Sequence, residues 1–191
     1  MMSVPRVFAV SATLAVAVLC ACVALFAGGA KPAEARVSGV LDANCGGTLD
    51  WNSGFAGDFR AQTFTAARTG KLTDARVRLK KLRNATGGVR VQIRRLDSGG
   101  APDATALAST KIPESAIRAG STFRNATAHF APKDAARVTA GNPYALVMKA
   151  GNRHYVAGTD SGCPGAFYFA PSSGSPFQQG SGDLLFSVFV D

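Results

Sequence analysis

In several short runs of this chain, apolar side chains occupy every second position, and this period limits the possible fold more than any other feature. The pattern is clearest at residues 75–79 and 89–93, where Ala, Val, Leu and Ile alternate with Arg and Gln. Side chains two residues apart share one face of a β-strand, whereas a helix repeats every 3.6 residues. Both runs therefore predict strands with one buried face.

Similar runs recur along the chain, at residues 62–66, 126–130, 144–149, 154–158, 166–170 and 184–190. The last run is apolar at almost every position, so we expect it to form a central strand. Stretches rich in Gly, Pro and Asn separate the runs and predict turns. Only residues 113–120 resemble a helical turn. The sequence predicts an all-β chain, an antiparallel sandwich or barrel.

The first 35 residues have the pattern of an export signal. A short basic segment ends at Arg6, and a long apolar run follows over residues 7–30. Small residues at Ala33 and Ala35 form the A-x-A site of a signal peptidase, so we expect cleavage between Ala35 and Arg36. The predicted domains are then a signal peptide over residues 1–35 and a β-sandwich domain over 36–191.

Two other interpretations of this segment are open. Residues 7–30 are long enough to span a bilayer, which needs about 20 apolar residues, and the segment would then be a retained anchor. In the other interpretation, Cys22 within "LCAC" is a lipidated residue. All three interpretations place residues 36–191 outside the cytoplasm, in an extracellular or cell-envelope location.

Two of the four cysteines lie outside the apolar segment, at Cys45 and Cys163. An even number of cysteines in an exported domain predicts a disulfide. The two cysteines are far apart in the sequence and do not have the short spacing that is typical of zinc ligands.

No catalytic motif is evident in the sequence. His129 and His154 both lie in strand patterns, with His129 expected on the outer side, and no serine lies in a G-x-S-x-G or S-x-x-K motif. We therefore expect no enzymatic activity. The alternatives are a small secreted hydrolase, in which a histidine meets a serine and a carboxylate in a cleft, and a purely structural surface protein.

No cofactor is expected, although a structural calcium ion is a weaker hypothesis. Calcium needs several oxygen ligands, and the candidate carboxylates lie near Gly, Ser or Asn, where Asp commonly stabilises turns. These residues are Asp42, Asp50, Asp58, Asp160 and Asp183. Two "NAT" triplets, at Asn84 and Asn125, match the glycosylation pattern of a eukaryotic secreted protein and are otherwise ordinary turn and strand residues.

Three aromatic residues are candidates for stacking against a sugar ring: Trp51, Tyr155 and Tyr168. Trp51 lies in a polar stretch, and Tyr168 alternates with Phe167 and Phe169, so it is expected to face outward if those two are buried. The competing interpretation is that these rings are part of the core, as most large rings are in a domain of this size.

Residues 76–96 contain eight Arg or Lys side chains and no acid. Cleavage removes Arg6, Lys31 and Glu34 from the 21 basic and 12 acidic residues of the chain. The predicted mature chain then has 19 basic and 11 acidic residues and a net charge of +8. Alternation places five basic side chains on the outer face: Arg76, Arg78, Lys80, Arg90 and Arg94. If the two strands form a hairpin, these side chains make a ladder of like charge, which destabilises a sheet mildly.

This basic face predicts a salt-sensitive partner: an anionic cell-wall polymer, an acidic glycan or a membrane surface. Nucleic acid is not expected, because no ring alternates with the arginines for base stacking. The competing interpretation is an ordinary solvated surface, where long Arg stems lie over apolar groups.

The order of segments "AQTFTAARTGKLTDARVRLKKL", "GVRVQIRRLDSGGAPDATALAST", "VTAGNPYALVMKAGNRHYVAG" and "GDLLFSVFV" resembles exported bacterial domains of the choice-of-anchor R family. The resemblance covers about residues 59–191. It implies a jelly-roll-like β-sandwich in an exported setting and brings no catalytic residues. The chain departs from the family pattern in having no anchoring motif after Asp191 and unusually basic strand faces. The predicted function is a non-catalytic binding or surface-attachment module, secreted or in the cell envelope.

Overall fold

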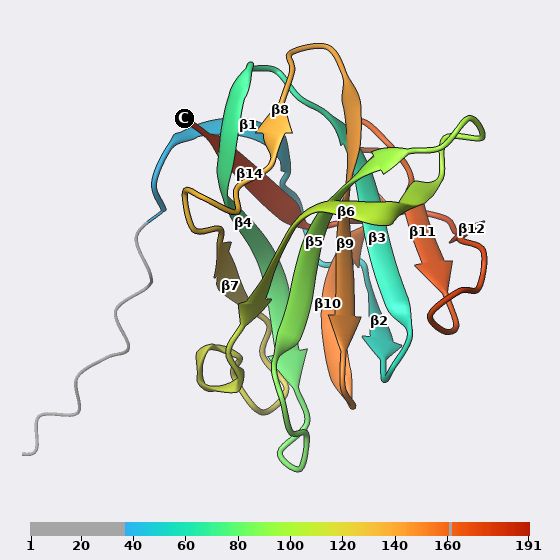
Figure 1. Ribbon diagram of the computed structural model, residues 1–191. Coiled ribbons are helices and arrows are strands. Elements are labelled where there is room, and N and C mark those ends of the chain that lie inside the picture. Colours follow the sequence, from blue (N-terminus) through green and yellow to red (C-terminus); the bar gives the residue numbers. More distant parts are fainter. Residues whose placement is uncertain (1–36, 161) are drawn as a thin grey trace, which may run out of the picture. The chain divides into compact units, whose positions relative to one another are not determined.

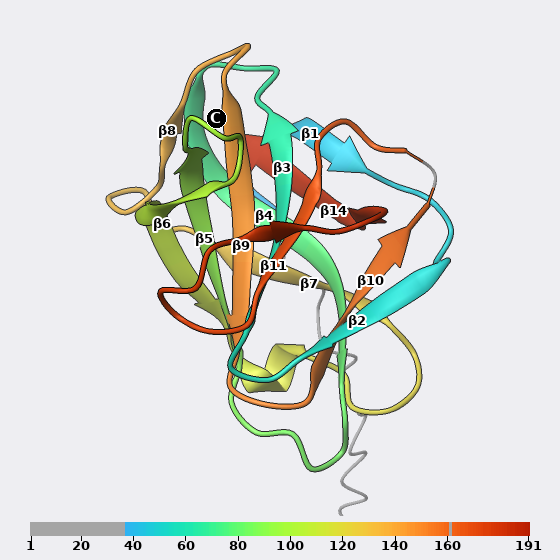
Figure 2. The same cartoon turned by 90° about the vertical axis from the view of Figure 1, so that its right-hand side faces the viewer.

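The computed structural model describes residues 37–160 and 162–191, which form a single all-β domain of two antiparallel sheets packed against each other. The two sheets are seen in Figure 1 and from the side in Figure 2. The predicted cleavage site, the apolar run 7–30 and Cys22 lie outside the described residues. Within the described part of the chain, no helix is long and apolar enough to cross a membrane.

The first sheet has the order β1-β14-β4-β10-β13, and three further strands pair with β10 or β4. Its strands are β1 (Val40–Cys45), β2 (Trp51–Phe55), β4 (Gly70–Lys81), β7 (Arg124–His129), β8 (Arg137–Val138), β10 (His154–Thr159), β13 (Asp183–Leu184) and β14 (Phe186–Val190). The apolar closing run is central, as predicted, because β14 pairs with β1 on one side and β4 on the other. The long strand β4 is the main support of this sheet, since four strands pair along it: β7, β8, β10 and β14.

The second sheet has the order β12-β11-β3-β9-β5-β6. Its strands are β3 (Phe59–Thr65), β5 (Val89–Leu96), β6 (Pro102–Ile112), β9 (Pro143–Ala150), β11 (Phe167–Ala170) and β12 (Gln178–Gln179). A short 3-10 turn (Glu114–Ala116) lies within the segment for which a helical turn was predicted. The strand β6 was not predicted, because its run of Ala, Ser and Thr has little apolar alternation.

The main core lies between the two sheets and is built from the alternating positions that the sequence identified. Val77 and Leu79 of β4 and Val89, Val91 and Ile93 of β5 are all at most 1% exposed. Side chains of both sheets belong to one buried cluster. The period-two pattern therefore identified the buried faces of both strands correctly.

A second, smaller apolar cluster covers the outer face of the second sheet. Its buried members are Phe59, Ala61, Ala145, Val147, Tyr168 and Ala170, and partly buried residues from the loops around Ala101 and Phe177 pack on them. Because these loops fold back over the sheet, its central strands β3 and β9 are buried on both faces. The strand β9 shows this directly, since five consecutive residues from Tyr144 are buried.

The hairpin that the sequence allowed between the two basic strands does not form. β4 lies in the first sheet and β5 in the second, so residues 82–88 cross from one sheet to the other. β5 pairs instead with β6 and β9. The crossing segment is fixed by Glu114, which accepts hydrogen bonds from Lys81 Nζ at 2.5 Å and from the Gly87 N–H at 2.7 Å. The expected ladder of like charge therefore does not form.

The predicted disulfide between Cys45 and Cys163 is present, with 5.5 Å between the two Cα atoms. Cys45 ends β1 and is 2% exposed, whereas Cys163 lies in the segment before β11. The Cys163 N–H also donates to Asp183 Oδ2 at 2.8 Å. The bond therefore joins the edge strand of the first sheet to the segment that leads into the second.

Candidate functional site

The basic side chains of β4 lie in the middle of the first sheet, on its outer face. Arg76 pairs across the strands with Thr127 of β7 and Ser187 of β14, and Arg78 pairs with Asn125. Val77 between them points into the core, which fixes both arginines on the opposite face. Both lie on the outer face, as predicted, and both are partly buried there.

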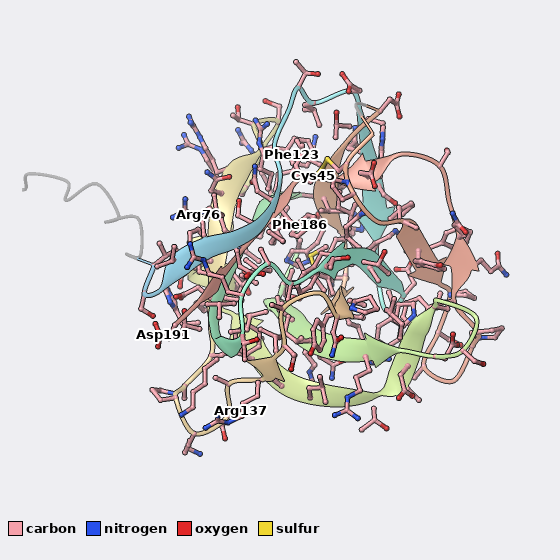
Figure 3. The ribbon with its side chains drawn as sticks, turned by 90° about the horizontal axis from the view of Figure 1, so that it is seen from above. Cys45, Arg76, Phe123, Arg137, Phe186 and Asp191 are labelled. Atoms are coloured by element: carbon pink, nitrogen blue, oxygen red, sulfur yellow. A yellow bond between two sulfur atoms is a disulfide. The ribbon has the colours of Figure 1, made fainter. Side chains whose placement is uncertain are left out.

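These two arginines line a hollow of about 360 Å³. Figure 3 shows Arg76, Cys45, Phe123 and Phe186, which all contribute to its wall. The remaining walls come from β7, β14 and the turn after β1. The described lining residues are Asn44, Cys45, Gly46, Gly47, Arg76, Arg78, Phe123, Arg124, Asn125, Leu185, Phe186 and Ser187, three arginines and no acid.

Among the described residues, the arginines of this hollow have no carboxylate partner. The ion pairs within residues 37–160 and 162–191 are Arg60–Asp58, Lys81–Glu114, His129–Asp74 and Lys133–Asp134. The Arg76 guanidinium lies 5.5 Å from the centre of the Phe189 ring. In this same part of the chain, the Arg78 guanidinium has neither a hydrogen bond nor an ion pair, although its backbone N–H donates to the Leu185 carbonyl. Two like charges about 7 Å apart along a strand repel by about 0.6 kcal/mol even in water, and an anion would relieve that repulsion.

The other three predicted anion-binding residues lie elsewhere. Lys80 is on the same face as Arg76, but its ammonium lies over the rings of Phe123, at 4.5 Å, and Tyr155, at 5.3 Å. Arg90 is exposed on the second sheet. The structure therefore divides the five residues between two sheets and brings only Arg76 and Arg78 together in the hollow.

The prediction that Arg94 is exposed is wrong, because this side chain is only 9% exposed. It does point away from the main core, but the loop containing Phe177 covers it. Its guanidinium lies between the rings of Phe59 and Phe177, at 5.7 and 5.9 Å, and donates to Gln92 Oε1 and the Asp103 carbonyl. Burial is the main cause that lowers the pKa of Arg94. Arg94 therefore holds a loop over the second sheet.

The three aromatic candidates do not form one platform. Tyr168 points opposite to Phe167 as predicted, but it is 8% exposed within the smaller cluster, so the expectation of an exposed ring is wrong. Tyr155 is partly exposed on the outer face of the first sheet, next to Lys80. Trp51 is partly buried at the edge of the main core, with its ring centre 5.2 Å from that of Phe167.

His129 is on the outer side of the first sheet, as predicted, and contacts a buried carboxylate. Its Nδ1 bonds to Asp74 Oδ1, and Asp74 is fully buried. Ser38 donates to the other oxygen of Asp74, from its N–H at 2.8 Å and from its hydroxyl at 2.9 Å. The serine thus bonds to the carboxylate and not to the histidine, which differs from the order of a hydrolytic triad.

His154 is fully buried at the start of β10. Its Nδ1 bonds to the Asn152 carbonyl, and its Nε2 has no hydrogen-bond partner among the described residues. Burial lowers the pKa of His154 from its ordinary value of 6.5, and the nearby charge of Lys81 lowers it further. The folded protein therefore favours the neutral imidazole.

We expect the free energy of unfolding to fall as the pH decreases from 7 to 5. Above pH 6.5, His154 is neutral in both states; below it, the unfolded chain takes up a proton that the folded chain resists. One proton gives a slope of at most about 1.4 kcal/mol per pH unit. Urea unfolding at several pH values measures the slope, and His154→Gln should flatten it. An unchanged slope in that variant would show that another group is responsible.

The candidate calcium carboxylates do not all stabilise their own turns, because Asp42, Asp50 and Asp183 accept hydrogen bonds from residues distant in the sequence. Asp42 accepts from the N–H groups of Ala67 and Arg68, and Asp58 accepts from the Ala56 N–H. The hydrogen bond from the Asp160 N–H is the main cause that lowers the pKa of Asp50, followed by the Thr48 and Thr159 hydroxyls. No three His, Cys, Asp or Glu residues of the described chain lie close enough together to hold a metal ion.

Several residues of the arginine hollow were not singled out from the sequence. Arg124 follows an unassigned loop, and Asn44 and Ser187 contact each other at 2.7 Å across β1 and β14, 143 positions apart. Short-range alternation carries no information about such pairs. The only available signal was a basic residue, Arg124, two positions before the run 126–130.

Comparison with known proteins adds no family to these observations. No family model matches the chain, and no curated protein matches it.

Proposed function

We propose that this protein is an exported, non-catalytic binding module that attaches to polymers with repeated anionic groups through the arginine hollow of the first sheet. The observation that carries this proposal is the presence of Arg76, Arg78 and Arg124 around one hollow whose described lining has no acid. Guanidinium groups bind phosphate and carboxylate oxygens through paired N–H donors. The partner class is an anionic cell-wall polymer, an acidic glycan or an anionic membrane surface.

Two further observations support this role. The disulfide favours an oxidising compartment, in agreement with the signal pattern and with the resemblance to choice-of-anchor R domains. The hydroxyl of Ser38 is used by Asp74, so the arrangement around His129 offers no activated nucleophile. Turnover of an ester or glycan substrate by the purified protein would contradict the non-catalytic part of the proposal.

The test is retention on bacterial cell walls, acidic glycans and anionic liposomes at low and high salt. We expect Arg76→Gln, Arg78→Gln and Arg124→Gln together to weaken binding about 10- to 100-fold at low salt, at about 0.5–1 kcal/mol per exposed contact. High salt should release the unchanged protein as well. Comparing retention on these three materials shows which class of partner the protein binds.

A matched control loses the same charge elsewhere. Arg90 and Arg95 of β5 and Arg137 of β8 are exposed and lie outside the hollow. If their replacement by Gln weakens binding as much as the hollow variant does, net charge explains the retention and the hollow does not.

A further inference from the structure

A second cleft lies along an open side of the sandwich, where the edge strand β2 of the first sheet approaches β11 of the second. Its volume is about 460 Å³, and its described lining combines aromatic rings with small polar side chains: Trp51, Asn52, Ser53, Asp160, Phe167, Phe169, Gly180 and Ser181. The ring centre of Phe167 lies 5.2 Å from that of Trp51 and 6.3 Å from that of Phe169. Trp51 of β2 and the two phenylalanines of β11, far apart in the sequence, thus form one continuous surface.

Glycines and a hydrogen bond hold this surface rigid. A Cβ on Gly158 would come within 2.2 Å of the Trp51 ring, and one on Gly180 within 2.6 Å of the Phe167 ring, so both rings lie directly against backbone. The Trp51 Nε1–H donates to the Thr159 carbonyl at 3.1 Å. The indole is therefore fixed before any ligand arrives, and little side-chain entropy is lost on binding.

The polar side chains of the cleft differ in charge from those of the arginine hollow. Asp160 is exposed at the rim, and its backbone N–H is held by Asp50 at 2.9 Å. No Lys, Arg or His within 37–160 and 162–191 forms an ion pair with the Asp160 carboxylate. A carboxylate accepts hydrogen bonds, and the amide of Asn52 both donates and accepts. This set suits hydroxyl groups and repels anions.

We propose that this cleft binds a pyranose ring of an uncharged glycan. The C–H face of the sugar packs on Trp51 and Phe169, since aromatic faces carry negative charge density and attract C–H groups. Ring hydroxyls donate to Asp160 and exchange hydrogen bonds with Asn52. An apolar surface with a few fixed polar groups is the usual composition of a small-molecule site. This site is separate from the arginine hollow and does not depend on it.

Trp51 is the only tryptophan of the chain, so its fluorescence reports on this cleft alone. The probes are trisaccharides of β-1,4-linked N-acetylglucosamine, β-1,4-linked glucose and α-1,4-linked glucose, with trigalacturonate as the anionic comparison. We expect at least one uncharged trisaccharide to shift the emission with a dissociation constant of about 1 mM or lower. Trigalacturonate should not shift it. The proposal would be overturned if no uncharged probe shifts the emission at about 10 mM, a concentration tenfold above the expected dissociation constant.

Two variants test the geometry. Asp160→Ala changes an exposed residue and should weaken the response at least about tenfold, because one charged hydrogen bond is lost. Phe169→Ala removes one ring and should weaken it too, once thermal unfolding shows that the variant folds. An unchanged response in Asp160→Ala would overturn the proposal. The variant lacking Arg76, Arg78 and Arg124 should respond like the unchanged protein, which separates this result from the proposed anion binding.

Discussion

Removal of the disulfide between Cys45 and Cys163 is expected to lower the free energy of unfolding by about 4 to 5 kcal/mol. The bond closes a loop of 118 positions, and a loop of this length restricts the unfolded chain strongly. The estimated entropy of closing a loop rises only slowly with its length, so the expected loss of stability depends little on the exact number of residues in the loop. A loss of this size is a large fraction of the free energy of unfolding of an ordinary domain.

Urea unfolding with and without reductant measures this effect. The Cys45→Ala, Cys163→Ala double variant should unfold at a midpoint at or below that of the reduced protein and should not respond to reductant. Cys45 is 2% exposed, so part of its loss in the double variant comes from packing, and the reduced protein gives the cleaner value. An unchanged midpoint after complete reduction would contradict the prediction.

Replacement of Ile93 by Ala is expected to lower the free energy of unfolding by about 2 to 5 kcal/mol. Ile93 is fully buried in the main core, in the middle of β5. The substitution removes three carbon atoms from a close-packed interior and leaves a cavity, and both effects destabilise the folded state. The same measurement on a residue of the opposite face tests whether the period-two pattern is correct.

Arg90 provides that control, because it lies in the same strand and is exposed. Arg90→Ala should change the free energy of unfolding by no more than about 0.5 kcal/mol. Chemical denaturation of the two variants under identical conditions gives the comparison. Equal losses from both substitutions would mean that β5 does not have one buried and one exposed side at these positions.

Sequence reasoning found the strand faces of β4 and β5 but not their neighbours. Val77 and Ile93 are buried because alternation is a local property that any two-sheet arrangement satisfies. The segment 82–88 contains Asn and two glycines, which suit a tight hairpin and equally a crossing between sheets. Long-range pairing decides between the hairpin and the crossing, since β5 pairs with β9, about 55 positions later in the sequence.

The errors of exposure have a common cause. Arg94 and Tyr168 face away from the main core as alternation requires, yet both are less than 10% exposed. Loops around Ala101 and Phe177 cover that face, and nothing in a strand's own period shows where a later loop will fold. For the same reason, the meeting of Trp51 with Phe167 in one cleft depends on contacts between separate sheets.

The pairing of the first strand with the last has a mechanical consequence. Val40 lies opposite Val190, so a pull on the two ends of the domain opens β1 from β14 one residue pair at a time, instead of shearing the strands past each other. This opening reaches Cys45 and stops there, because a covalent bond anchors that residue to Cys163. The six residues of β1 would release about 20 Å of chain. Beyond that extension, tension passes along the released β1 and through the disulfide to the segment before β11, and the chain between the two cysteines carries none of it.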